Sequence, residues 1–285
     1  MDALLATLGD EIQDVDEEVF DLFSQSSSLE DLGMLNSKTA VLDVNIAGRD
    51  FEITQSPGLL ESQREGGTTG AAVWQSTVRC AEWMETTDNV LFTSAVLNSE
   101  STVLELGAGI SGILPCILGP KVDKFVCTDQ AYTLKALQSN ITSNTRATRS
   151  SSKSKRSDTN VRVLPLDWET DDASSFLHSN GLSPGPDMII ACDCIYNYAL
   201  IRPFVQTCAD LSKARRVALE AAEMPSVPTL CIVVQQLRQA EVFEQWVTTF
   251  HQFFHVWRVP SDQLSVGLQD GSGFAVHIGL LREES

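Results

Sequence analysis

The sequence is poor in positive charge and has no apolar run long enough to span a bilayer. Its 20 Lys and Arg face 38 Asp and Glu, which gives a net charge of −18 and a pI near 4.5. Such a surface would repel phosphate backbones, so no direct binding to nucleic acid is expected. No run approaches the roughly 20 apolar residues of a membrane helix, and the start lacks a secretory or mitochondrial leader pattern. We therefore expect no membrane association, a cytoplasmic or alternatively nuclear location, and a cationic partner.

Cysteine occurs in an odd number and without the C-x-x-C spacing of zinc sites. Five of the seven cysteines lie in apolar segments, which predicts reduced thiols. His251 and His255 stand one helical turn apart, but aromatic residues surround them and no third ligand is near. The sequence therefore predicts neither a disulfide scaffold nor a metal site.

Two segments depart from the average composition. Residues 1–36 hold ten acidic side chains and no Lys or Arg, with apolar residues at helical spacing from Leu4 to Phe23. This pattern predicts one acidic amphipathic helix, which is either docked on the domain or an arm that attracts a basic substrate. Residues 145–160 hold five basic side chains among Ser and Thr, which predicts a disordered surface insertion. We expect residues 37–285 to form one domain.

From residue 102 onward, strand patterns alternate with helix patterns. Strand-favouring runs stand at 102–106, 124–128, 161–166, 187–192 and 230–235, with closing strands at about 253–259 and 273–281. This alternation predicts an α/β fold, with a seven-stranded, mostly parallel sheet and helices on both faces. A glycine turn between the runs 41–46 and 51–55 predicts an additional β-hairpin.

A glycine turn follows the strand at 102–106, with Gly107, Gly109 and Gly112 in the pattern G-x-G-x-x-G. Glycine lets the main chain approach a ligand closely, so the turn suits a nucleotide-like cofactor. Asp129, at the end of the next strand, is spaced to accept hydrogen bonds from both ribose hydroxyls of such a cofactor. NAD and S-adenosylmethionine share that ribose, so Asp129 alone leaves both open.

Acidic residues at the strand ends favour one of these two cofactors. Glu105, Asp129, Asp167 and Asp193 stand at four consecutive strand ends. Carboxylates beside the turn would repel a pyrophosphate, whereas they would stabilise the sulfonium and the ammonium of S-adenosylmethionine. Asp167 and Trp168 also suit the amino group and the ring of adenine. The pattern therefore favours S-adenosyl-L-methionine.

These motifs resemble those of the seven-β-strand protein-lysine methyltransferases of the methyltransferase-like 21 group. The segments that carry the resemblance are Leu104 to Gly109, Thr128-Asp129, Leu166 to Trp168 and Asp193 to Tyr196, preceded by Gly70 and Trp74. The run from Gly109 to Leu114 is most similar to fungal ribosomal-protein lysine methyltransferases. The resemblance implies a Rossmann-like class I methyltransferase fold, S-adenosyl-L-methionine as cofactor, and a basic protein substrate that is ribosomal or translation-associated. It also implies a monomer.

The resemblance further implies the residues of the site. Those that would bind the cofactor are Trp74, Gly107, Ala108, Gly109, Asp129, Trp168 and Cys192. Asp193 and Tyr196 would be catalytic and face the incoming lysine. The absence of an Asn-Pro-Pro-Tyr sequence argues against planar amide or adenine nitrogens as substrates.

Several alternatives stay open from the residues alone. Asp193 is equally well placed to cap the following helix, and Trp74 to be an ordinary core aromatic. The same fold would also suit an NAD-dependent oxidoreductase, although no hydride-transfer pair is evident. A third reading is a binding module without catalytic activity.

Overall fold

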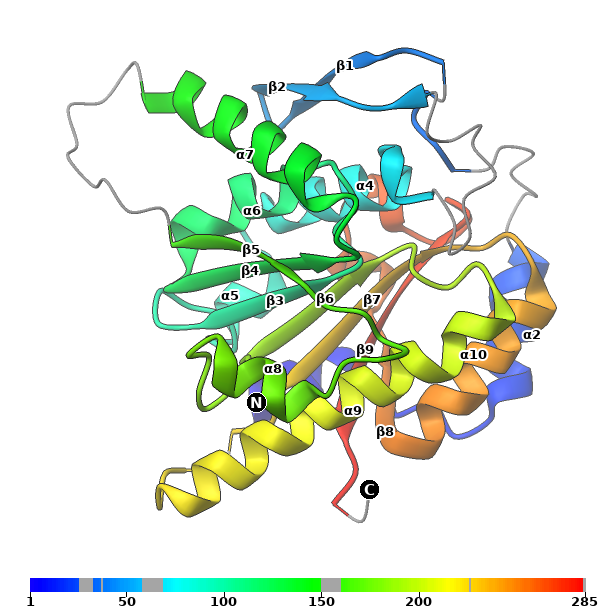
Figure 1. Ribbon diagram of the computed structural model, residues 1–285. Coiled ribbons are helices and arrows are strands. Elements are labelled where there is room, and N and C mark those ends of the chain that lie inside the picture. The colour runs from blue at the N-terminus through cyan, green and yellow to red at the C-terminus, as the bar shows by residue number, and fades with distance from the viewer. Residues whose placement is uncertain (26–32, 37, 58–68, 150–159, 226, 284–285) are drawn as a thin grey trace.

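The computed structural model describes residues 1–25, 33–36, 38–57, 69–149, 160–225 and 227–283. Its centre is a seven-stranded sheet with the order β5-β4-β3-β6-β7-β9-β8 (Figure 1). The strands are β3 (Thr102–Leu106), β4 (Lys124–Asp129), β5 (Val161–Pro165), β6 (Met188–Cys192), β7 (Leu230–Gln236), β8 (Phe254–Arg258) and β9 (Phe274–Leu281). The first five in this order run parallel, and β9 is antiparallel to both of its neighbours.

The central strands are apolar along their whole length because helices cover both faces of the sheet. Every residue of β6 and β7 is buried. The predicted α/β class, the seven strands and the closing antiparallel pair are confirmed. The sequence did not predict that β9 would insert between β7 and β8.

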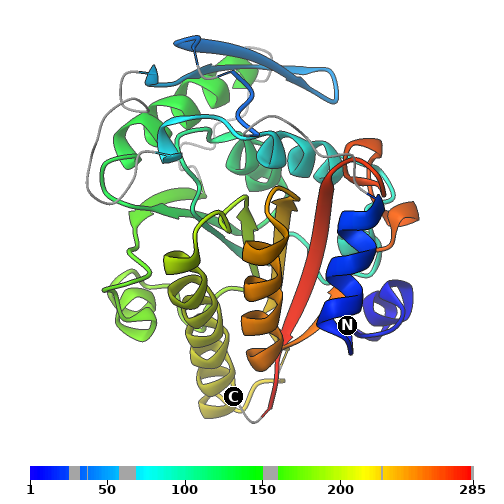
Figure 2. The ribbon, with the colours of Figure 1, turned by 90° about the vertical axis from the view of Figure 1, so that its right-hand side faces the viewer.

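Two hydrophobic clusters lie on the two faces of the sheet (Figures 1 and 2). On one face pack α4 (Gln75–Met84), α5 (Val90–Thr93), α6 (Ile113–Leu118) and α7 (Leu134–Arg149). On the other pack α8 (Ala173–Ser179), α9 (Tyr198–Ala221) and α10 (Ala240–Phe253). Short 3₁₀ turns occur at Thr69–Ala71, Gly119–Lys121, Ser261–Gln263 and Val266–Leu268. None of the described helices combines the length and the apolar composition needed to cross a membrane.

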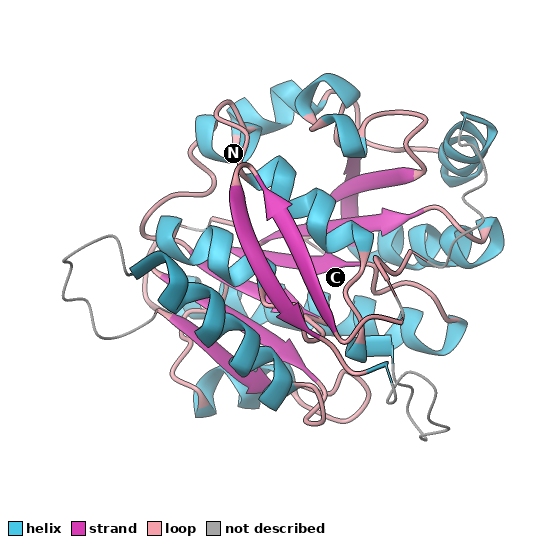
Figure 3. Ribbon diagram, turned by 90° about the horizontal axis from the view of Figure 1, so that it is seen from above, coloured by secondary structure: helices cyan, strands magenta, loops and turns pink. Residues whose placement is uncertain are grey.

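The hairpin of β1 (Val41–Ile46) and β2 (Arg49–Thr54) lies outside the helix layer, across α7 (Figure 3). Two asparagine amides of α7 pair with the open edge of β2. Asn144 bonds both backbone groups of Glu52 at 3.0 Å, and Asn140 bonds those of Thr54 at 3.0 and 2.9 Å. These amides satisfy backbone groups that an edge strand otherwise leaves unpaired.

The acidic N-terminal segment forms two helices, α1 (Asp2–Leu8) and α2 (Val15–Gln25), and not the single helix that the apolar spacing predicted. Gly9, with φ of 80°, ends α1. The Asp14 carboxylate then accepts hydrogen bonds from the amides of Asp16 and Glu17 at 2.9 and 3.1 Å and begins α2. Local stop and start signals therefore override the continuous apolar stripe.

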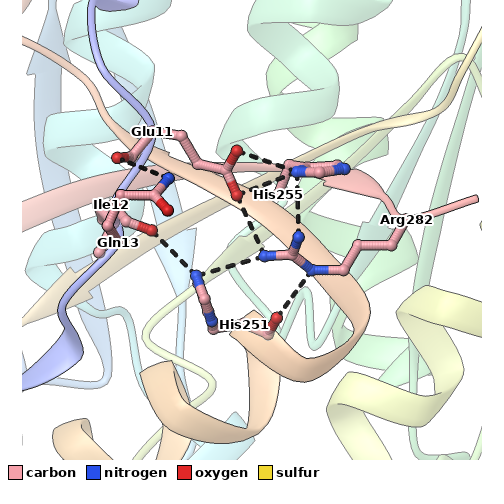
Figure 4. Close-up of polar contacts among 6 residues, drawn as sticks. All are labelled: Glu11, Ile12, Gln13, His251, His255 and Arg282. Carbon is pink, nitrogen blue, oxygen red and sulfur yellow. Dashed lines mark hydrogen bonds and ion pairs between the residues drawn. The ribbon is translucent and has the colours of Figure 1, made fainter.

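Both connections of this segment to the domain use acidic side chains. Glu11 contacts His255 at 3.0 Å and Arg282 at 3.1 Å, and His251 lies 2.9 Å from the carbonyl oxygen of Ile12 (Figure 4). In α2, the buried Glu18 lies 2.8 Å from His277. The segment is thus docked, as the first of the two readings predicted. His251 and His255 serve these contacts, and no group of metal ligands forms among the residues that the structure describes.

The basic stretch after residue 144 is partly helical. Helix α7 continues to Arg149, so the predicted disordered insertion is wrong for residues 145–149. Residues 150–159 lie outside the described part of the chain. Asn160 re-enters the sheet, where its side chain donates to the carbonyl oxygens of Gly119 and Val122 at 2.7 and 2.8 Å. All seven cysteines are buried and free, in keeping with reduced thiols.

Candidate active site

A cavity lies at the carboxyl ends of the parallel strands, where the strand order reverses between β3 and β6. Open α/β sheets bind ligands at this position. The cavity has a volume of about 340 Å³, which is in the usual range for small-molecule sites. It is lined by all the residues named from the motifs: Trp74, Gly107, Ala108, Gly109, Asp129, Trp168, Cys192, Asp193 and Tyr196. The structure thus brings them together, and their chemical roles stay predictions.

The turn after β3 has almost no room for side chains. Gly107 and Gly109 adopt φ of 67° and 58°, in the left-handed region that favours glycine. A Cβ on Gly107 would lie 2.6 Å from the Cys194 sulfur and 3.2 Å from the Trp168 ring. The amide of Ala108 donates to the Thr128 carbonyl at 3.0 Å and ties the turn to β4. The main chain therefore forms the cavity wall itself at this point.

Asp129, the last residue of β4, supports the same turn. Its Oδ2 accepts a hydrogen bond from the Gly109 amide and its Oδ1 one from the Gln130 amide, both at 2.7 Å. Burial raises the pKa of Asp129, and the two backbone donors oppose that rise. A carboxylate has about four acceptor positions. Asp129 therefore keeps the capacity to accept further hydrogen bonds from a ligand in the cavity.

Two tryptophans line the cavity from opposite sides of the sequence. Trp74 precedes the first residue of α4, and its indole nitrogen donates to the Thr69 carbonyl at 3.0 Å. It is only partly buried, unlike the core aromatic of the alternative reading. Trp168 packs edge-on against Phe204, and its buried indole nitrogen has no hydrogen-bond partner in the described part of the chain. An orphan donor at a cavity wall fits a site that a ligand completes.

Asp193 and Tyr196 lie in the loop between β6 and α9. Asp193 adopts φ of 60°, a left-handed conformation that strains a residue with a side chain. Tyr196 spans the cavity, and its hydroxyl accepts a hydrogen bond from Thr69 Oγ1 at 3.2 Å. Partial burial raises the pKa of Tyr196, so the phenol stays protonated at neutral pH. Strained residues of this kind concentrate at functional sites.

Helix α9 is capped by another residue than the one proposed from sequence. The side chain of Asn197 accepts a hydrogen bond from the Ala199 amide at 2.8 Å, which makes Asn197 the N-cap. Asp193 instead accepts hydrogen bonds from Gln235 Nε2 at 3.0 Å and from the Arg238 guanidinium. The capping alternative for Asp193 is therefore wrong, because its carboxylate is engaged with residues after β7.

The structure corrects the role predicted for Glu105. This residue is 2% exposed and does not line the cavity. It lies inside β3, one position before the last, so the alternation of side chains along a strand directs it into the core beside Cys127. Burial raises the pKa of Glu105 to about 8, which keeps it uncharged at neutral pH. It therefore supplies no carboxylate to a bound sulfonium.

Reading the sequence missed two polar residues of the site. Gln235 and Arg238 hold the Asp193 carboxylate, and both belong to the carboxyl end of β7 or the turn after it. The signal that points to them is the polar sequence Gln235-Gln236-Leu237-Arg238, which ends an apolar strand. The argument from strand ends stopped at the fourth strand and needed only to continue to the fifth.

Comparison with known proteins identifies the family. Residues 53–227, more than half of the chain, match the family model described as lysine methyltransferase. Ribosomal lysine N-methyltransferase 5 of Zygosaccharomyces rouxii is 29% identical over 289 residues, which cover 83% of this chain and 88% of that protein. A Schizosaccharomyces pombe protein named diaminohydroxyphosphoribosylamino-pyrimidine deaminase is 28% identical over 263 residues. That alignment covers 89% of this chain but only 55% of the yeast protein.

Among solved structures, the N-methyltransferase NodS from Bradyrhizobium japonicum in complex with S-adenosyl-L-homocysteine has a TM-score of 0.43. It is 10% identical, and the match covers 74% of this chain and 91% of that one. The family model carries the assignment, and it agrees with the family that the motifs predicted. The chain belongs to the lysine methyltransferase family.

Proposed function

We propose that this chain methylates a lysine of a ribosomal or translation-associated protein, with S-adenosylmethionine as methyl donor. The observation that carries the proposal is one cavity in which residues suited to this donor stand beside Asp193 and Tyr196. The name of the Zygosaccharomyces rouxii relative supports a ribosomal substrate. The net charge of −18 suits a basic ribosomal protein through long-range attraction. We further propose that the protein acts as a monomer in the cytoplasm.

The residues present fit S-adenosylmethionine. The glycine turn admits a ligand close to the main chain, Asp129 retains acceptor capacity for ribose hydroxyls, and Trp168 offers an unpaired donor. When bound, the cofactor supplies a methyl group on a positively charged sulfur. Asp129 and Trp168 would hold its adenosine part, and the glycine turn with Cys192 the part that follows.

Asp193 and Tyr196 would act on the substrate lysine. A lysine amine has a pKa near 10.4 in water, so the cavity must receive it in the uncommon neutral form. Asp193 would accept a hydrogen bond from the amine and Tyr196 would orient it, which aligns the nitrogen for attack. The contact between Tyr196 and Thr69 narrows the access of water at the same point. Neither residue has to be a strong base in this arrangement.

The deaminase name of the Schizosaccharomyces pombe relative is not extended to this chain. Zinc-dependent deaminases of nucleobases use a C-x-x-C pair with a third ligand. This sequence has no C-x-x-C, and the described residues contain no cluster of metal ligands. The family model lies within the part that the two proteins share, so methyl transfer is the activity that the shared region supports.

Incubation of the purified protein with radiolabelled S-adenosylmethionine and ribosomes tests the proposal. Wild type is expected to label a ribosomal protein on lysine, and Asp129→Ala to bind the cofactor about 10- to 100-fold more weakly, because charge-assisted hydrogen bonds are lost. Asp123→Ala is the matched control, since Asp123 is an exposed acid just before the other end of β4. A wild type that binds no cofactor by calorimetry and labels nothing contradicts the proposal. Binding without labelling across extracts favours the non-catalytic binding module.

A further inference from the structure

The Asp193 carboxylate, at the wall of the cavity, is neutralised by a cation that does not itself line the cavity. Its side chain is 1% exposed and forms an ion pair with the Arg238 guanidinium. Oδ1 accepts the second hydrogen bond, from Gln235. Asp193 lines the cavity and Arg238 does not. Any effect of Arg238 on the chemistry must therefore pass through Asp193.

Arg238 is held in position from three sides. Its Nε donates to Gln236 Oε1 at 3.1 Å, and its guanidinium carbon lies 5.3 Å from the centre of the Trp74 ring. Gly33 covers the same group, since a Cβ there would lie 2.6 Å from Arg238 Nη2. A planar guanidinium fixed by stacking and by directed hydrogen bonds is pre-organised, as a flexible ammonium would not be. The pair is thus built before any substrate arrives.

The remaining charges around the cavity are all negative. Asp129, Asp167 and Glu169 line it, together with Tyr196 and the thiols of Cys192 and Cys194. No Lys, Arg or His is among the lining residues of the described chain. An unpaired carboxylate at Asp193 would add to this field and would stabilise a lysine as its ammonium. An ammonium has no lone pair and cannot attack the methyl group.

We propose that Arg238 is a positioning residue that neutralises Asp193, so that this carboxylate accepts a hydrogen bond from the substrate amine without stabilising the ammonium. The inference rests on the proposed methylation of lysine and adds the reason why the amine is neutral when it reacts. Burial raises the pKa of Asp193 and the charge of Arg238 opposes that rise, so the pair also keeps Asp193 ionised. Loss of Arg238 has the same consequence by either route. The amine stays protonated to higher pH, or Asp193 itself takes up the proton.

The pH dependence of the methylation rate, from pH 6 to 10 with saturating ribosomes and cofactor, tests this role. For Arg238→Gln we expect the rising limb to move by about one unit to higher pH, which is about a tenfold loss at pH 7 that narrows at high pH. Arg238→Lys restores the charge and is expected to return the limb most of the way to wild type. An unmoved limb with a uniformly lower rate means that Arg238 is only structural, and overturns the inference.

Two further variants keep the test decisive. Gly33→Ala displaces the guanidinium without removing it, so the limb must move in the same direction even where Arg238→Gln fails to fold. Arg215→Gln is the matched control, because Arg215 pairs with Asp187 before the opposite end of β6. It should leave the limb in place.

Cofactor affinity separates the two proposals. Calorimetry of Arg238→Gln should give the wild-type affinity for S-adenosylmethionine, because Arg238 does not line the cavity. Wild type that neither binds the cofactor nor methylates overturns the proposed function. Active wild type with an unmoved limb in Arg238→Gln and Gly33→Ala overturns only the role of Arg238.

Discussion

Strand β6 is flanked by an aspartate and its arginine at each end, and the two pairs are built differently. Before the strand, Asp187 accepts hydrogen bonds from the Thr102 amide at 2.7 Å and from Arg215. Arg215 also donates to the Gly185 carbonyl at 2.9 Å. After the strand, Asp193 is engaged with Arg238, has a left-handed backbone and lines the cavity.

The difference lies in what each pair faces. Asp187 joins neighbouring strands, since its amide donates to Thr102 and its carbonyl accepts from Leu230. Asp193 faces a cavity, and its backbone conformation costs free energy that the fold must offset elsewhere. Residue type and charge partner are the same at both ends. Position relative to the carboxyl ends of the parallel strands therefore separates a structural ion pair from a functional one.

The largest effect is expected for Asp187→Ala, in stability alone. Removal of the carboxylate leaves Arg215 unpaired with a side chain only 8% exposed, which should cost about 3 kcal/mol in the free energy of unfolding. The rate per folded molecule should stay near wild type. Urea unfolding followed by an activity assay below the transition measures both. A large loss of rate in the folded protein would show that the two ends of β6 are not functionally distinct.

Asp193→Ala should show the reverse pattern. Loss of the acceptor for the substrate amine is expected to lower kcat by about 100-fold through misalignment. The cost in stability should be smaller than for Asp187→Ala, because Arg238 is 18% exposed and can be hydrated. Single-turnover rates and urea midpoints compare the two variants directly. Equal losses of rate and stability in both would remove the distinction drawn here.

The same comparison shows what the sequence could and could not reveal. Carboxyl ends of parallel strands meet at one edge of the sheet, so Asp129 and Asp193 could be placed at one site from strand patterns alone. Glu105 was misplaced because it lies one residue inside its strand, where the pleat decides which face a side chain takes. Arg238 contacts Asp193 across 45 positions of sequence, and no local pattern carries such a contact.

Glu105 provides a third case, in β3 and opposite Ile190 of β6. Folding raises its pKa from 4.5 to about 8. Between these values the unfolded chain releases a proton that the folded protein keeps, so the stability of wild type falls as pH rises. Glu105→Gln does not titrate. Its stability relative to wild type should therefore increase from pH 5 to pH 7, by an amount on the order of 2 kcal/mol.

Urea unfolding at both pH values measures this difference. The result depends on the change with pH, so any constant cost of the amide cancels. Asp123→Asn, at an exposed acid before β4, is the control and should show no comparable change. A difference that is the same at pH 5 and pH 7 would mean that Glu105 is already ionised in the folded protein. The acidic rim predicted for the cofactor would then regain one member.

The smallest effect is expected at Asn197, which takes the capping role once open to Asp193. Asn197→Ala removes the acceptor of the Ala199 amide and should cost about 1 kcal/mol in stability. Asn197→Ser keeps a capping oxygen and should recover most of it. If the alanine variant is as stable as wild type in urea while Asp193→Ala shortens α9 by circular dichroism, the helix begins at Asp193 after all. The contrast between the two ends of β6 would then weaken, because Asp193 would have a structural role as well.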